Sequence, residues 1–221
     1  MFVKLIRSLV LGVALAAALP AASQAYTLDF EGVGSFASIS EFYNGGFDIP
    51  STGAPASGVN YGASFTGDAL ALQNDALGPY FANAPTPGTI MFVAPGSDAV
   101  LNVASGFKDS ISFYYSSAVD AFNVVKIYSG LNHTGTLLAK IALQINIDNG
   151  CTGATFCNFQ QISHSFAGIG KSIDFGANPA VAGQAAFDNV SITPVPEPES
   201  LAMLLAGLGL MGAVVRRRKQ A

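Results

Sequence analysis

Apolar and polar residues alternate with a period of two over most of the chain between residues 26 and 193. The run 110–115 places Ile111, Phe113 and Tyr115 on one face and polar residues on the other. The longest run, 137–147, does the same over eleven positions. This pattern predicts half-buried β-strands. The apolar face of the longest run consists of Leu137, Ala139, Ile141, Leu143, Ile145 and Ile147.

Further short apolar segments of this kind are separated by Gly-, Asn-, Pro- and Ser-rich turns, and no segment has the 3.6-residue period of an amphipathic helix. About ten short strands with such turns predict an all-β fold, a single β-sandwich of jelly-roll type over residues 26–193. The additional strands are expected at 26–30, 69–73, 89–93, 99–103, 121–128, 158–166, 172–175 and 185–192.

The N-terminus has a different pattern, with Lys4 and Arg7 preceding an uninterrupted apolar run over residues 8–19. Ser23 and Ala25 satisfy the small-x-small rule for signal-peptidase cleavage. We therefore expect residues 1–25 to be a signal peptide and Tyr26 to be the first mature residue. A permanent anchor is the alternative, but twelve apolar residues fall short of the roughly 20 that span a bilayer.

The C-terminus carries a second apolar run, residues 201–215, which predicts a transmembrane helix that is short for a permanent anchor. A basic cluster follows it and would hold the cytoplasmic side of the membrane, so the domain would lie outside. A Pro-Glu-Pro triplet precedes it, and its prolines keep the backbone extended. The triplet is Pro196, Glu197 and Pro198, and the basic cluster is Arg216, Arg217, Arg218 and Lys219.

The order of triplet, apolar span and basic end over residues 194–221 resembles the PEP-CTERM sorting signal. This resemblance implies export through the inner membrane of a Gram-negative bacterium, transient anchoring, and processing by an exosortase. It also implies release or attachment at the cell surface, in bacteria that make exopolysaccharide and biofilm matrix. A tail anchor with a coincidental triplet is the alternative.

Composition narrows the classes of partner. Only 11% of residues are charged, against about 25% in an average soluble domain. Residues 26–195 carry four lysines and twelve acids, a net charge of −8. Nucleic-acid binding is therefore excluded, because contacts to phosphate need a basic surface.

Three acids are candidate metal ligands. If Val190 and Ile192 face the core, the period of two also places Asp188 inward, where a carboxylate needs hydrogen bonds or a cation. Asp29 and Glu31 lie on one face of the first strand, and the first and last strands of jelly rolls often lie close together. The segments around these acids, Leu-Asp-Phe-Glu-Gly at 28–32 and Phe-Asp-Asn-Val-Ser-Ile at 187–192, resemble the ends of carbohydrate-binding-module and lectin-like sandwiches. This resemblance implies a structural calcium. The alternative is that Asp188 accepts bonds from backbone amides while the other two acids are solvated.

Cys151 and Cys157 most simply form a disulfide in an exported protein, whereas a redox pair would lack the Cys-x-x-Cys spacing. His133 and His164 lie near no nucleophile motif, so we expect no catalytic site and no resident cofactor apart from calcium. Tyr114 shares the solvent-facing parity of its strand and is the best candidate for stacking on a sugar ring.

The sequence thus predicts a surface or matrix protein with a structural or adhesive role in exopolysaccharide, whose partners are signal peptidase, exosortase and the inner membrane. A dedicated carbohydrate-binding module is the first alternative. A secreted glycan hydrolase or lyase is the second, and it would need two carboxylates facing each other across a cleft.

Overall fold

The computed structural model describes residues 24–95, 99–147, 151–195, 206–207 and 209–210. Residues 24–195 belong to one compact unit, Ser23–Glu197, which we call the body. Most of the predicted signal peptide, the Pro-Glu-Pro triplet and the basic cluster lie outside the described residues. Within the described parts, no helix is long and apolar enough to cross a membrane.

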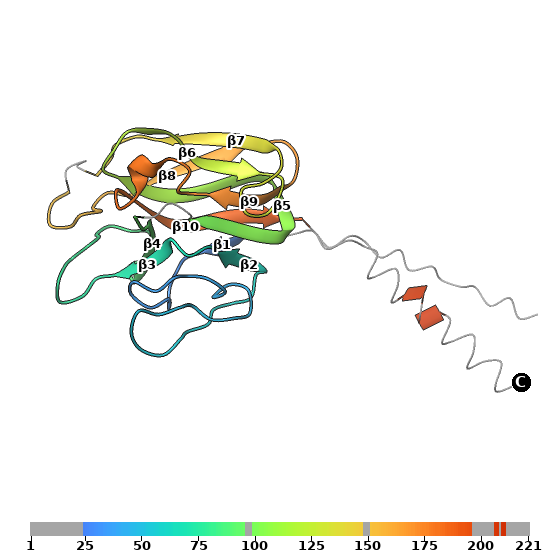
Figure 1. The fold of residues 1–221 in the computed structure, drawn as a ribbon, viewed down its shortest axis with the longest axis horizontal. Coiled ribbons are helices and arrows are strands. Elements are labelled where there is room, and N and C mark those ends of the chain that lie inside the picture. Colours follow the sequence, from blue (N-terminus) through green and yellow to red (C-terminus); the bar gives the residue numbers. More distant parts are fainter. Residues whose placement is uncertain (1–23, 96–98, 148–150, 196–205, 208, 211–221) are drawn as a thin grey trace, which may run out of the picture. The chain divides into compact units, whose positions relative to one another are not determined.

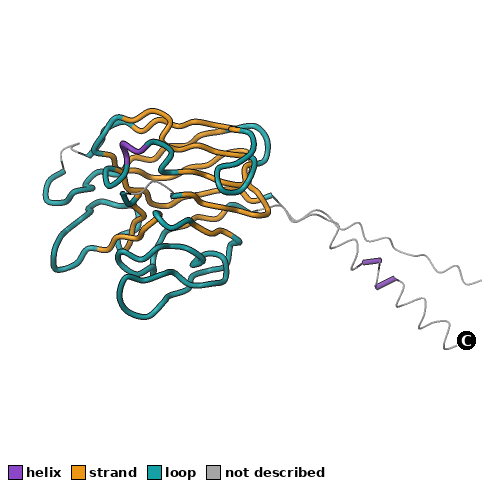
Figure 2. Tube along the Cα trace, in the orientation of Figure 1, coloured by secondary structure: helices purple, strands orange, loops and turns teal. Residues whose placement is uncertain are grey.

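The body is an all-β structure, as the alternating pattern predicts (Figures 1 and 2). Its only regular helical turn in the described range is the short 3₁₀ helix η1, Pro179–Val181. The strands are β1 (Tyr26–Leu28), β2 (Ala63–Phe65), β3 (Ala69–Gln73), β4 (Thr89–Val93), β5 (Val100–Ser117), β6 (Ala121–Tyr128), β7 (Leu137–Leu143), β8 (Gln160–Ser165), β9 (Gly170–Asp174) and β10 (Ala185–Pro194).

Strand β5 organises the sheet because it pairs with different neighbours along its length. Its first half pairs with β2 and β9, and its second half pairs with β10 and β8, all antiparallel. The hydrogen-bonded path runs β3-β4-β10-β5-β9-β6-β7, and β1 adds to β10. The change of partners coincides with Gly106 and Asp109, which both have positive φ and interrupt the regular ladder.

One hydrophobic cluster draws on both ends of this path. Met91 on β4 and Ile141 on β7 belong to it, together with Phe113 and Phe187 from the central strands. The rings of Phe113, Phe175 and Phe187 meet edge to face with centroids 4.9–5.9 Å apart. Strands from both ends of the sheet therefore contribute to one core, which the apolar faces of the alternating strands form.

A second, smaller cluster covers the opposite face of β3, β4 and β10. Leu72, Ile90 and Ala186 contribute to it from the strands, and Phe81 and Phe156 pack on them from two loops. The segments 80–84 and 151–159 thus form a cover on this face. The Gly-rich region 29–62 instead lies as loops against the main cluster, blue in Figure 1 and teal in Figure 2.

The predicted strand at 137–147 is shorter than its pattern suggests. The strand ends at Leu143, Ile145 is exposed, and Ile147 packs at the second cluster. After Leu143 the chain leaves β6, and the buried Asn146 bonds to the end of β5 instead. Its Oδ1 accepts from the Ser117 amide at 2.6 Å, and its Nδ2 donates to the Tyr115 carbonyl at 2.9 Å.

Candidate functional site

Asp188 is fully buried, but on the face opposite to the one predicted. Phe187, Val190 and Ile192 all belong to the main core, and this is impossible for strict alternation. A bulge resolves the conflict: the register with β5 shifts after Asp188, and Asn189 has a φ of +49°. The extra residue turns Asp188 toward the second cluster, so the inference of a shared inward side with Val190 and Ile192 is wrong.

The segment before β4 closes over this carboxylate. Thr86 donates from its backbone amide at 3.0 Å and from its hydroxyl at 2.8 and 2.9 Å, and the amide of Asn189 donates at 2.7 Å. Burial nevertheless raises the pKa of Asp188 to about 6, and the nearby Glu31 charge adds to this, while the bonds from Thr86 and Asn189 lower it.

The other two predicted ligands are also hydrogen-bonded to the protein. Oε1 of Glu31 accepts from the amides of Gly88 and Thr89, and Oδ1 of Asp29 accepts from the Glu31 amide and the Tyr43 hydroxyl. Within the described residues, no group of three or more His, Cys, Asp and Glu side chains is arranged to hold a metal ion. Calcium binding at Asp29, Glu31 and Asp188 stays a prediction.

Asp29 and Glu31 instead line one side of a hollow of about 240 Å³. Phe42, Tyr43 and Tyr61 also line it, and the exposed Val59 stands at its rim. Tyr61 is held from behind by Tyr26, whose ring is parallel to it at 4.5 Å. Burial raises the pKa of Tyr43 above its usual range, and the adjacent Asp29 charge raises it further, so its hydroxyl stays a neutral donor to Asp29.

The predicted stacking residue, Tyr114, lies elsewhere. It is half-buried on β5, with Gln161 of β8 and Asp188 of β10 as its register partners, and it does not line the hollow. Its role in sugar stacking stays a prediction. The pairing of Tyr26 with Tyr61 could not be anticipated, because residue 61 lies in a loop region whose pairing the alternating pattern leaves open.

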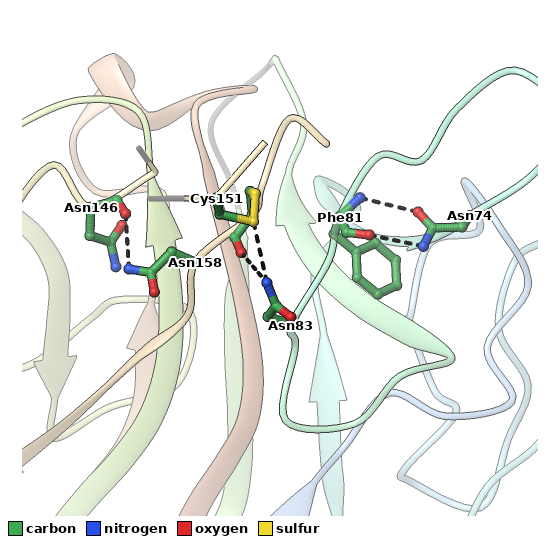
Figure 3. Close-up of a disulfide and its surroundings, with 7 residues drawn as sticks. Asn74, Phe81, Asn83, Asn146, Cys151 and Asn158 are labelled. Carbon is green, nitrogen blue, oxygen red and sulfur yellow. Dashed lines mark hydrogen bonds between the residues drawn. A yellow bond between two sulfur atoms is a disulfide. The ribbon is translucent and has the colours of Figure 1, made fainter. Parts of the chain in front are cut away.

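The predicted disulfide between Cys151 and Cys157 is confirmed, with a Cα–Cα distance of 5.6 Å. Figure 3 shows how it joins the cover over the second cluster: the Asn83 amide donates to Cys151 Sγ and to the Cys157 carbonyl. Phe81 and Phe156 form a backbone bridge beside it. The disulfide therefore closes the covering loop 151–159 on itself, and Asn83 and the Phe81–Phe156 bridge hold that loop against the segment 80–84.

Of the two histidines, His133 lies in the turn after β6, with Nδ1 3.8 Å from Asp174, and His164 lies on β8 opposite Ile111. Asp174 bonds the Gly176 amide and sits in the strand ladder of β9. His133 therefore lies in a turn and His164 in a strand.

The first and last strands of the body lie side by side. Tyr26 pairs with Ile192 and Leu28 with Val190. Beyond Ile192, Thr193 and Pro194 pair with Lys108 and Phe107 of β5, and the Val195 amide donates to the Gly106 carbonyl at 2.9 Å. Pro196 follows at once. The Pro-Glu-Pro triplet therefore begins directly where the sheet ends.

A family model for the PEP-CTERM protein-sorting motif matches residues 194–219. The chain carries a PEP-CTERM sorting motif. The match starts at the last residue of β10 and covers the triplet, the apolar span and the basic cluster predicted from the sequence. The PEP-CTERM motif marks a protein for export and for membrane anchoring before cleavage, and it implies an exosortase as the sorting partner.

No curated protein matches the chain. Among solved structures, a carbohydrate binding module from Cellvibrio mixtus lichenase 5A, in complex with cellotriose, is similar over 52% of this chain and 83% of its own. The identity is 14% and the TM-score is 0.32.

Proposed function

We propose that this PEP-CTERM protein is a non-enzymatic component of the cell surface or extracellular matrix, with a structural or adhesive role in exopolysaccharide. The observation that carries the proposal is the sorting motif placed directly after the last strand. A disulfide and an acidic body of low charge are consistent with an exported protein. We further propose that the fold is a jelly-roll sandwich, because the ends of its sheet share one core.

Mass mapping of the C-terminus tests the sorting step. In cells that contain the exosortase, the mature protein should lack residues 216–221, and in cells without the enzyme it should retain them. The N-terminus should begin at Tyr26 in both. Retention of residues 216–221 in both strains would contradict the proposal.

A second candidate function, binding of glycan, is favoured by the hollow beside β1. The half-buried ring of Tyr61 and the two carboxylates are the kinds of group that sugar recognition uses, an apolar ring and acceptors for hydroxyl groups. Asp29 and Glu31 repel anionic sugars. We therefore expect neutral or amino sugars, and not uronates, to bind there.

Affinity electrophoresis in dextran, glucosamine oligomer or alginate tests this candidate. The body should be retarded by dextran or the glucosamine oligomer and not by alginate. Val59→Glu replaces an apolar side chain at the rim by a strongly hydrated one and should weaken the binding of dextran, which is uncharged, about tenfold, corresponding to ~1.4 kcal/mol. The matched control is Leu77→Glu, at a more exposed apolar position outside the hollow, which should leave binding unchanged. Retardation by alginate alone, or equal binding by both variants, would contradict the candidate.

A further inference from the structure

The sorting motif has no spacer on its body side. Residues 193–195, which we call the exit segment, are the last residues before Pro196, and each is held at β5. On the other edge of β10, the pairing with β1 stops at Ile192. Ile192, the residue before the exit segment, is 1% exposed and fixed in the core.

An extended peptide that is bound as an added strand is held through its main-chain hydrogen bonds. Pro196 and Pro198 have no N–H to offer. The nearest main-chain donor on the body side is thus the amide of Val195, and the Gly106 carbonyl already accepts its hydrogen bond. An exosortase that bound this stretch as an extended strand would compete with β5 for the Val195 amide.

The neighbourhood of Gly106 makes this attachment specific. Gly106 has a φ of +85°, and a Cβ there would lie 2.6 Å from the side chain of Ile169 and 3.2 Å from the Gly170 carbonyl. The Val195 side chain lies on the same surface. The carbonyl that accepts the hydrogen bond from Val195 therefore belongs to a tightly packed glycine within β5.

From this geometry we infer that detachment of the exit segment from β5 precedes cleavage, so that the body controls access of the exosortase to its own sorting motif. The inference rests on the proposed sorting function. Detachment is limited to three residues because the strand is fixed at Ile192. The enzyme therefore works on a body that stays folded.

Insertion of Gly-Ser-Gly-Ser between Val195 and Pro196 tests the inference in the full-length precursor, in cells that contain the exosortase. The inserted residues offer free main-chain groups next to the motif, so the rate of processing in a pulse-chase should rise about tenfold. That factor corresponds to ~1.4 kcal/mol, about one net backbone hydrogen bond. The matched control places the same insertion in the exposed loop between Gly53 and Ala54, where the rate should not change.

The opposite change is a disulfide that holds the exit segment to β5. Lys108 and Thr193 are opposite each other in the antiparallel register, at a spacing that a disulfide can bridge. The Lys108→Cys/Thr193→Cys variant should be processed about tenfold more slowly than either single variant, and a reductant should restore the rate. Equal rates for the parent, the spacer variant and the locked variant would overturn the inference. A parent that is not processed at all would instead defeat the proposed function.

Discussion

The buried carboxylate of Asp188 carries a measurable pH dependence. Its pKa lies at about 6 in the folded protein, against an ordinary value of 3.8, chiefly because burial disfavours the charged form. Between these values the folded state binds more protons than the unfolded state. Its contribution to the free energy of unfolding is thus full below about pH 4 and is lost as the pH rises through about 6.

Asp188→Asn tests this prediction, because asparagine keeps the shape and one acceptor for Thr86 while removing the titration. We expect the melting temperature of the parent, relative to this variant, to fall between pH 4 and pH 7. Differential scanning calorimetry at several pH values measures it. A difference that is the same at every pH would show that Asp188 does not titrate in this range.

The same region shows where single residues limit prediction from sequence. The alternation of apolar residues correctly indicated that Asp188 is buried, but the bulge at Asn189 put it on the other face. Asparagine tolerates positive φ better than most residues, which is the one local signal that was available. Thr86, a loop residue between two prolines, carried no signal of its contact with a strand 102 positions away.

At the scale of elements, the disulfide closes the covering loop 151–159, to which the segment 80–84 is hydrogen-bonded. Reduction should destabilise the body by about 2 kcal/mol, because the closed loop is short. For a body of this size that is a fall of roughly 4 to 8 °C in melting temperature. Thermal unfolding with and without reductant measures it, with intact mass as proof of reduction.

Asn83→Ala is the companion variant, since Asn83 connects the two loops next to the sulfurs. It should lower the melting temperature of the oxidised protein, and it should have a smaller effect once the disulfide is reduced. Equal effects in both states would show that the loops do not depend on one another.

Most strands were predictable because each is a local pattern. The ranges of β3, β4 and β6 agree with the alternation to the residue. Two predicted strands, 99–103 and 110–115, fall in the single strand β5, Val100–Ser117, and Gly106 and Asp109 form irregularities within it between the two predicted ranges. Strand β2 was missed, since three residues between glycines are too few to show a period.

At the scale of the whole molecule, the sorting motif was predictable and the sheet topology was not. The motif is a contiguous order of residues that can be read without knowing the fold. Strands β2 and β9 both pair with β5, although they lie far apart in the sequence. No local pattern encodes such pairings. The hollow beside β1 was missed for the same reason, because β1 and the loop 57–61 are joined only in the folded body.

The pairing of β1 with β10 has one more consequence. Because Tyr26 and Ile192 are register partners, the body begins and ends at the same place. Domains whose ends lie together can be inserted into a surface loop of another protein without stretching either one. We therefore expect that this body can be inserted into a surface loop of another protein and still fold.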